Sequence, residues 1–294
     1  MRKTGSFLLL LLVLFVDVCF GAYFSAFDLQ GEWKVGVIKC RNVIYSAGEK
    51  VSGLCGFDIS VAGKYQVIAY IYHNWKHNVP RIGTKFTDSS GKVFEGYHKI
   101  ENMWYLNPHT QDGRWMFVSL LGGTYSEFSK GKVTMEFAVS GQKECWDDSE
   151  VEMEGIFAVE AVYVVPVVEE NGAFVMGWRN GLEECEGNWH YSRYEEKFNT
   201  DLIRSKESGE IAKMRSSFLY KGNHDLFLSV FAEKGGELKV SVDGAKEQKI
   251  SFEPSNEWQV ISLRFFADRG TRDVFITNIA GSDIGIDYVF LIPA

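Results

Sequence analysis

Three stretches of this 294-residue chain group aromatic side chains with polar ones. The groups are Asn74-Trp75, Trp104-Tyr105 with Asn107, and Trp146-Asp147. The flat face of an indole or phenol ring can pack against the C–H groups of a sugar, while polar neighbours bond its hydroxyls. The groups therefore indicate carbohydrate binding. The alternative is that the rings fold back and pack the loops that carry them.

These groups lie in the three long connections of the first half, residues 73–80, 99–113 and 140–151. Strands of an antiparallel sandwich run alternately up and down, so every second connection lies at the same end. Counting the predicted strands, the three long connections are alternate ones. We expect them to gather at one end of a single domain.

Each half of the chain ends in an apolar strand that a single acid interrupts. The strands are residues 158–166, with Glu160, and residues 285–293, with Asp287. Apolar residues on both faces indicate a strand buried between neighbours. Strict alternation puts Asp287 on the face opposite Tyr288. A carboxylate in such a place must be solvated, paired or metal-bound, because burying it bare is too costly.

Motifs that identify common enzymes are absent. The sequence has no Gly-x-Ser-x-Gly elbow, no His-Glu-x-x-His and no phosphate-binding loop. His73 and His77, with Asp147 or Asp148, make only a weak metal site, because a spacing of four in a loop imposes no shared face. A carboxylate pair for glycoside hydrolysis stays open, since sequence does not give the separation. We expect a protein that is not an enzyme.

The amino-terminal segment is typical of a secretory signal. Arg2 and Lys3 precede an apolar run at residues 7–16, and the small residue Gly21 follows. The run is shorter than the roughly 20 residues that span a membrane, so we expect cleavage after Gly21. A lipoprotein anchor at Cys19 is the alternative. The chain is expected to be secreted, periplasmic or at the cell surface.

The charge pattern excludes some partners. The formal net charge is −8 and there is no basic run, so nucleic acid and anionic membrane surfaces are not expected partners. No segment after the signal is long enough to span a bilayer.

An even number of cysteines follows the predicted signal peptide. They are Cys40, Cys55, Cys145 and Cys185. In a secreted chain this favours two disulfides, with three possible connectivities. A Cys40–Cys55 bridge would close a local loop, and Cys145–Cys185 would then tie the two halves together.

Short strands separated by Gly- and Asp-rich turns fill the chain, and helical periodicity is scarce. This pattern predicts an all-β fold of sandwich or jelly-roll type. Gly-led strands, a Trp-led strand and an acid-bearing closing strand recur in the same order in both halves, which indicates an internal repeat. We predict a signal peptide at 1–21 and two tandem antiparallel β-sandwich (jelly-roll-like) domains at 22–166 and 167–294.

From Gly222 onward the chain resembles β-sandwich carbohydrate-binding modules, which are often appended to secreted glycoside hydrolases. The residues that carry the resemblance are Gly222, Asp243-Gly244, Trp258, Gly270 and Ile286-Asp287-Tyr288. The first half resembles these modules more loosely. The chain departs from them at Gly285, where such modules often have a sugar-binding Asn, and this weakens a sugar site in the second domain.

The resemblance also implies a cofactor. Many such modules hold a structural calcium ion with an acid of the closing strand as ligand, which here would be Asp287 and, by the repeat, Glu160. Calcium takes six to eight oxygen ligands.

The leading hypothesis is a secreted, non-catalytic protein whose first domain holds a glycan or cell-surface polysaccharide by its aromatic and polar loops. The first alternative is a structural or adhesive cell-surface protein that binds other proteins. A glycoside hydrolase is the less favoured alternative.

Overall fold

A computed structural model describes residues 22–25, 30–47, 50–74, 78–99, 113–121, 125–144, 147–151, 155–170, 173–175, 178–179, 182–218, 221–243 and 246–294. Apart from one short turn of 3₁₀ helix, η2 (Leu182–Glu184), the regular elements in these ranges are strands. The expected all-β fold is confirmed.

The first domain consists of two sheets. Its inner sheet contains β1 (Ala22–Ser25), β3 (Lys34–Ile38), β4 (Arg41–Ala47), β6 (Gly63–His73), β9 (Arg114–Ser119), β10 (Ser126–Phe128) and β13 (Ile156–Pro166). Its outer sheet contains β2 (Gln30–Gly31), β5 (Val51–Ile59), β7 (Val79–Thr87), β8 (Val93–Lys99), β11 (Gly131–Glu144) and β12 (Asp147–Val151).

The second domain also consists of two sheets, and a small hairpin of β14 (Val168–Glu170) and β15 (Ala173–Val175) precedes it. The inner sheet contains β16 (Trp178–Arg179), β18 (His190–Glu195), β19 (Thr200–Ser205), β21 (Gly222–Phe231), β24 (Gln259–Ala267) and β26 (Ile284–Pro293). The outer sheet contains β17 (Glu186–Gly187), β20 (Ile211–Phe218), β22 (Gly236–Val242), β23 (Gln248–Phe252) and β25 (Gly270–Asn278).

Strand pairings repeat from one domain to the other. The outer sheets run β2-β5-β11-β7-β8 and β17-β20-β25-β22-β23. In the inner sheets, β13 lies between β4 and β6 as β26 lies between β19 and β21. Strands in the described part of both domains pair antiparallel, which is the pairing pattern of two tandem sandwiches.

Each sandwich has its own apolar core, because one face of each sheet turns inward. In β5 buried and exposed residues alternate along the whole strand, as expected for a sheet with one solvated face. The first core contains Phe86, Phe137 and Val159, and the second contains Val240, Ile276 and Ile286.

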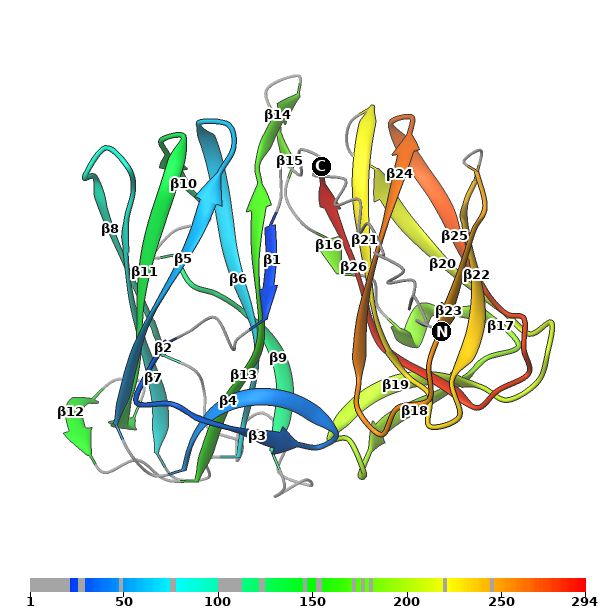
Figure 1. Cartoon of the computed structure of the whole chain (residues 1–294), viewed down its shortest axis with the longest axis horizontal. Coiled ribbons are helices and arrows are strands. Elements are labelled where there is room, and N and C mark those ends of the chain that lie inside the picture. Colours follow the sequence, from blue (N-terminus) through cyan, green and yellow to red (C-terminus); the bar gives the residue numbers. More distant parts are fainter. Residues whose placement is uncertain are drawn as a thin grey trace, which may run out of the picture.

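The two inner sheets pack against each other, so the molecule is a stack of four sheets (Figure 1). A third apolar cluster fills this interface and includes Tyr70, Tyr163, Tyr288 and Phe290. The hydroxyl groups of Tyr163 and Tyr288 are hydrogen-bonded across it at 2.6 Å. This is why β13 and β26 read as apolar on both faces: one face lines a core and the other the interface.

Both closing strands contain a β-bulge at their acid. In β13 the pairing with β6 shifts between Val159 and Ala161, and Glu160 has no partner in it. In β26 the pairing with β21 shifts in the same way and skips Asp287. The prediction that Asp287 faces away from Tyr288 is therefore wrong, because the extra residue of a bulge turns both toward the same side.

The prediction of disulfides at Cys40 and Cys55 is wrong, since both thiols are free. Cys55 points into the core of the first domain, whereas Cys40 packs against Phe198 and Trp258 of the second. Cys185 is also free, and Cys145 lies outside the described residues.

No helix within the described part of the chain is long and apolar enough to cross a membrane.

Candidate functional site

The strand ends that carry the three long connections lie at one end of the first domain. His73, where the first connection begins, is paired with Arg114 of β9 and with Phe157 of β13. At the other edge of this end, Arg81 is paired with Lys99. Within each sheet, the described strand ends next to the long connections are therefore neighbours.

Most residues of the predicted loop site cannot be placed. Trp75, Trp104, Tyr105, Asn107 and Trp146 lie outside the described residues, and so does the side chain of Asp147 in β12.

Asn74, the described member of the predicted loop site, has a structural contact. Its Oδ1 accepts a hydrogen bond from the backbone N–H of Ile156 at 2.6 Å, and its own N–H donates to the Ile156 carbonyl at 3.2 Å. The side chain therefore ties the end of β6 to the start of β13.

A groove of about 360 Å³ lies on the outer sheet of the first domain, over β5, β11, β7 and β8. Its floor is a row of small residues that runs across the strands. Ser52 is opposite Ala138, Ala138 is opposite Gly83, and Gly83 is opposite Tyr97. A side chain at Gly83 would meet no atom within 4 Å of its Cβ. The groove exists because three neighbouring strands have a small residue in the same row.

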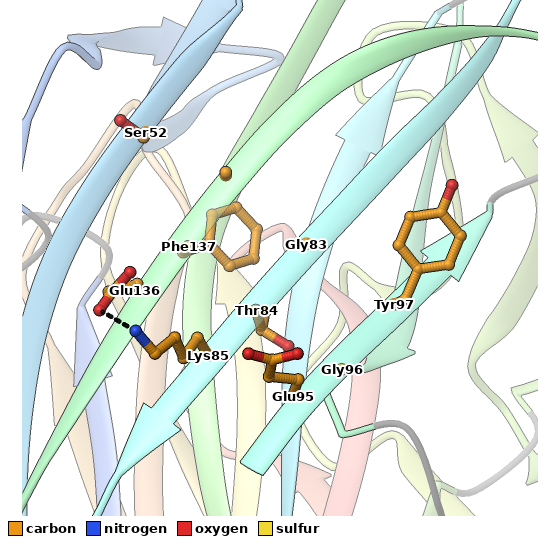
Figure 2. A pocket seen from close by; sticks show the side chains of 10 residues that line it. Ser52, Gly83, Thr84, Lys85, Glu95, Gly96, Tyr97, Glu136 and Phe137 are labelled. Carbon is orange, nitrogen blue, oxygen red and sulfur yellow. Dashed lines mark ion pairs between the residues drawn. The ribbon is translucent and has the colours of Figure 1, made fainter. Parts of the chain in front are cut away.

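Tyr97 closes one end of this row (Figure 2). The ring is 40% exposed and the guanidinium of Arg81 lies 4.3 Å from its centroid. Its hydroxyl donates a hydrogen bond to Gln142 Oε1 at 2.9 Å. Cation–π contact and this hydrogen bond fix the ring in place, so it is a prepared flat surface at the groove.

The next row of the sheet is charged. Glu136 is opposite Lys85, and Lys85 is opposite Glu95. Lys85 Nζ lies 3.4 Å from Glu136 Oε1, and both side chains are about half exposed. This row forms a polar rim on one side of the groove, able to donate and accept hydrogen bonds.

The two acids predicted as metal ligands meet an arginine in the domain interface. Arg41 Nη1 donates to both oxygens of Glu160, at 2.8 and 2.7 Å, and to Ser229 Oγ at 3.1 Å. Arg41 Nη2 donates to Asp287 Oδ2, which also accepts from the Tyr70 hydroxyl at 2.7 Å. The arginine therefore joins an acid of each domain.

Burial and charge act together on this cluster. Burial lowers the pKa of Arg41, but the carboxylates of Asp287 and Glu160 more than offset this and raise it above its ordinary value. Burial raises the pKa of Glu160 to about 7, against the opposing effect of the Arg41 charge. Arg41 is thus a permanent cation, as expected of a paired guanidinium.

These surroundings do not fit a calcium ion at Asp287 and Glu160. The described neighbours are a guanidinium and hydroxyl groups, whereas calcium takes six to eight oxygens. Asp287 Oδ1 has no hydrogen-bond partner among the described residues, but one free oxygen does not make such a set. Arg41 already supplies the positive charge that the buried acids require.

Sequence reasoning missed the groove and Arg41 for different reasons. Gly83 and Ala138 become neighbours only through strand register, for which the sequence carries no local signal. For Arg41 the sequence does carry a signal, because two acids in strands predicted to be buried must be solvated, paired or metal-bound.

No model of a known protein family matches the chain, and no curated protein sequence matches it. Solved structures do. The C-terminal CBM6 of a marine laminarinase from Zobellia galactanivorans is 16% identical and covers 40% of this chain and 99% of its own, with a TM-score of 0.35. A family 35 carbohydrate-binding module from Clostridium thermocellum is 14% identical and covers 41% and 100%, with a TM-score of 0.36.

A third similar structure spans both domains. The N-terminal CBM22-1–CBM22-2 tandem domain of a Paenibacillus barcinonensis protein is 8% identical and covers 93% of this chain and 98% of its own, with a TM-score of 0.32. The two-sandwich architecture follows from the strand pairings and does not depend on these likenesses. The chain is similar, over one domain or over both, to carbohydrate-binding modules, the class that its sequence resembles.

Proposed function

We propose that this protein is a secreted, non-catalytic carbohydrate-binding protein, and that the groove on the outer sheet of its first domain holds the glycan. The apolar segment at residues 7–16, behind Arg2 and Lys3, supports secretion. The observation that carries the proposal is the transverse row from Ser52 to Tyr97.

The dimensions of this row suit a short oligosaccharide. Neighbouring strands lie about 4.8 Å apart, so a row across four strands is roughly 14 Å long. A sugar at one end would pack on the open face of Tyr97, and the following units would lie over Gly83 and Ala138. The charged row of Glu136, Lys85 and Glu95 would bond their hydroxyls.

The loop residues predicted from the sequence would extend this site. Arg81, which lies beside Tyr97, is paired with Lys99, where the connection at residues 99–113 begins. We expect a glycan that extends past Tyr97 to contact the aromatic residues predicted in the long connections.

The placement of the acids favours binding over hydrolysis. Glycoside hydrolysis uses two carboxyl groups that flank the bond to be cut. Glu95 and Glu136 stand in one row on the same side of the groove, with Lys85 between them. A glycan in the groove would have both acids on one flank, which suits hydrogen bonding.

The test is a binding titration with a panel of soluble neutral and acidic polysaccharides. Gly83→Val places an isopropyl group in the groove, so we expect binding to be lost. Because valine is favoured in β-strands, the fold should not change. Thr134→Val is the matched control, because it places a valine on the same outer sheet, in β11, but outside the groove lining. Trp75→Ala and Trp104→Ala measure the contribution of the loops.

Four outcomes would count against the proposed site or the proposed function. Equal affinity of Gly83→Val and wild type would exclude the groove, and loss only in the loop variants would restrict the site to the loops. Binding to no glycan in the panel, with specific binding to a surface protein, would favour the adhesive alternative. Turnover of any polysaccharide by the pure protein would make it a hydrolase.

A further inference from the structure

The Arg41 guanidinium sits in a cage to which both domains contribute. The side chain is fully buried, and its guanidinium carbon lies 4.9 Å from the ring centroid of Trp115 and 4.4 Å from that of Trp258. Its hydrogen bonds go to Glu160 of the first domain and Asp287 of the second. An indole and a carboxylate from each side are a favourable environment for a flat cation.

The cage is built from equivalent positions of the internal repeat. Its two acids are the bulged residues of β13 and β26. Trp115 is level with Ala158, two residues before the acid of β13. Trp258 directly precedes β24 and lies next to Gly285, where a Cβ would be 3.8 Å from its ring; Gly285 is two residues before the acid of β26. Each domain therefore contributes the same half of the cage.

The cation comes from one domain alone. Ile44 in β4 is opposite the residue before the first acid, and Ile203 in β19 is opposite the residue before the second. The position equivalent to Arg41 is therefore Thr200, a residue without charge. One arginine serves two carboxylates.

The turn of the β3–β4 hairpin positions Arg41, because it contacts the second domain. Its two turn residues, Lys39 and Cys40, both have positive φ, 52° and 63°, as in the tightest hairpin turns. The Cys40 carbonyl accepts a hydrogen bond from the Trp258 N–H at 2.8 Å. Lys39 Nζ donates to the Glu196 carbonyl at 3.3 Å. The turn is thus held where Arg41 can enter the cage.

We propose that this interdomain cage is a guanidinium-binding site, and that Arg41, as its resident cation, holds the two domains together. Without the arginine, Glu160 and Asp287 would face each other unpaired inside an apolar interface. Such burial is strongly disfavoured, so the interface would open to admit water or take up another flat cation. The proposal does not depend on the glycan-binding function.

The experiment compares the wild type with Arg41→Ala in the full chain, by small-angle scattering and by thermal unfolding with and without millimolar guanidinium chloride. Matched concentrations of sodium chloride control for ionic strength. Arg204→Ala is the control variant, because Arg204 also donates hydrogen bonds to a carboxylate, from Nε and Nη2 to Asp283, but on the exposed surface of the second domain. Arg41→Lys keeps the charge and loses the fork.

The wild type and Arg204→Ala are expected to be compact and to unfold in one transition that guanidinium does not raise. Arg41→Ala should show a larger radius of gyration or two transitions, and guanidinium should restore the compact form. Arg41→Lys should fall between them, and it serves as the test if the alanine variant does not fold. Wild-type compactness and melting temperature in both Arg41 variants would overturn the proposal. So would guanidinium raising the stability of all proteins equally.

Discussion

The outer sheets of the two domains have the same strand order but carry different side chains on their outward surfaces. In the first domain the row across the sheet reads Ser52, Ala138, Gly83 and Tyr97. Gly131 and Gly270 begin equivalent strands, and counting from them the same row in the second domain reads Ile211, Thr277, Lys239 and Lys249. Two lysines therefore stand where the first domain has its glycine and its tyrosine.

Lysines on the outer sheet of the second domain also form ion pairs with neighbouring acids. Lys213 Nζ lies 3.1 Å from Glu186 Oε2 and 3.2 Å from Asp273 Oδ2, and Lys239 Nζ lies 3.3 Å from Glu247 Oε1. The comparison teaches that two sheets with the same strand order can present different surfaces. The difference lies in the size and charge of the side chains in one transverse row.

The largest expected effect comes from giving the first domain the second domain's residue. Gly83→Lys should weaken glycan binding by about 100-fold or more, or ~2.7 kcal/mol, because the lysine would lie in the groove. The Cβ meets no atom within 4 Å, so stability should not change. Calorimetric titration and thermal melting measure the two effects. Unchanged affinity of Gly83→Lys for the glycan would show that this row does not hold it.

The domains also differ at the last residue of β6. This residue is His73 in the first domain, and its equivalent by strand register in the second domain is Ala232. Burial lowers the pKa of His73 to about 3, from an ordinary value of 6.5. The neutral ring is therefore favoured in the folded state, so its contribution to stability is present above pH 6.5 and is lost as pH falls toward 3. By pH 5 the loss should be roughly 2 kcal/mol.

His73→Phe should remove this loss, and denaturant unfolding of both proteins from pH 7 to pH 5 measures it. The raised pKa of Glu160 has the opposite sign: its contribution is lost as pH rises through about 7. His224, whose pKa burial lowers to about 4, acts in the same direction as His73. Both are present in the two proteins and cancel in the difference. Parallel pH curves would contradict the account of His73.

A smaller effect is expected from removing the aromatic end of the groove. Tyr97→Ala should weaken glycan binding about tenfold, or ~1.4 kcal/mol, because a ring surface and its packing on the sugar are lost. Tyr97→Phe keeps the ring and is the matched control, with affinity close to wild type. Equal losses in both variants would assign the effect to the hydroxyl and Gln142 instead.

The smallest effect is expected at the polar rim. Glu136→Gln breaks the half-exposed pair with Lys85, and the free energy of unfolding should change by no more than about 0.5 kcal/mol. Affinity for a neutral glycan should fall no more than about threefold, since the amide still offers hydrogen bonds. A large loss would mean that Glu136 is a principal contact.

Much of the fold could be predicted because it depends on local patterns. The apolar closing strands, the Gly-led strands at Gly131 and Gly270 and the Trp-led strands at Trp115 and Trp258 indicated two repeated sandwiches, and the strand pairings repeat in that way. The side on which the acids lie could not be predicted, because a bulge adds one residue without a distinct sequence mark.

The candidate site depended on contacts between distant residues. Arg41 pairs with acids 119 and 246 positions away, and the row through Gly83 needs the register of four strands. The sequence drew attention instead to the aromatic loops, because tryptophans beside asparagines in a predicted loop are a local signal. Trp75, Trp104, Tyr105 and Trp146 stay a prediction.

Hydrogen exchange of the full chain, with and without the tightest-binding oligosaccharide of the panel, tests the central claim most directly. The account predicts slower exchange on binding in the outer sheet of the first domain, at residues 81–85 and 95–97, and no change in the equivalent residues 237–241 and 247–249. Protection confined to the second domain, or absent from both outer sheets, would contradict it.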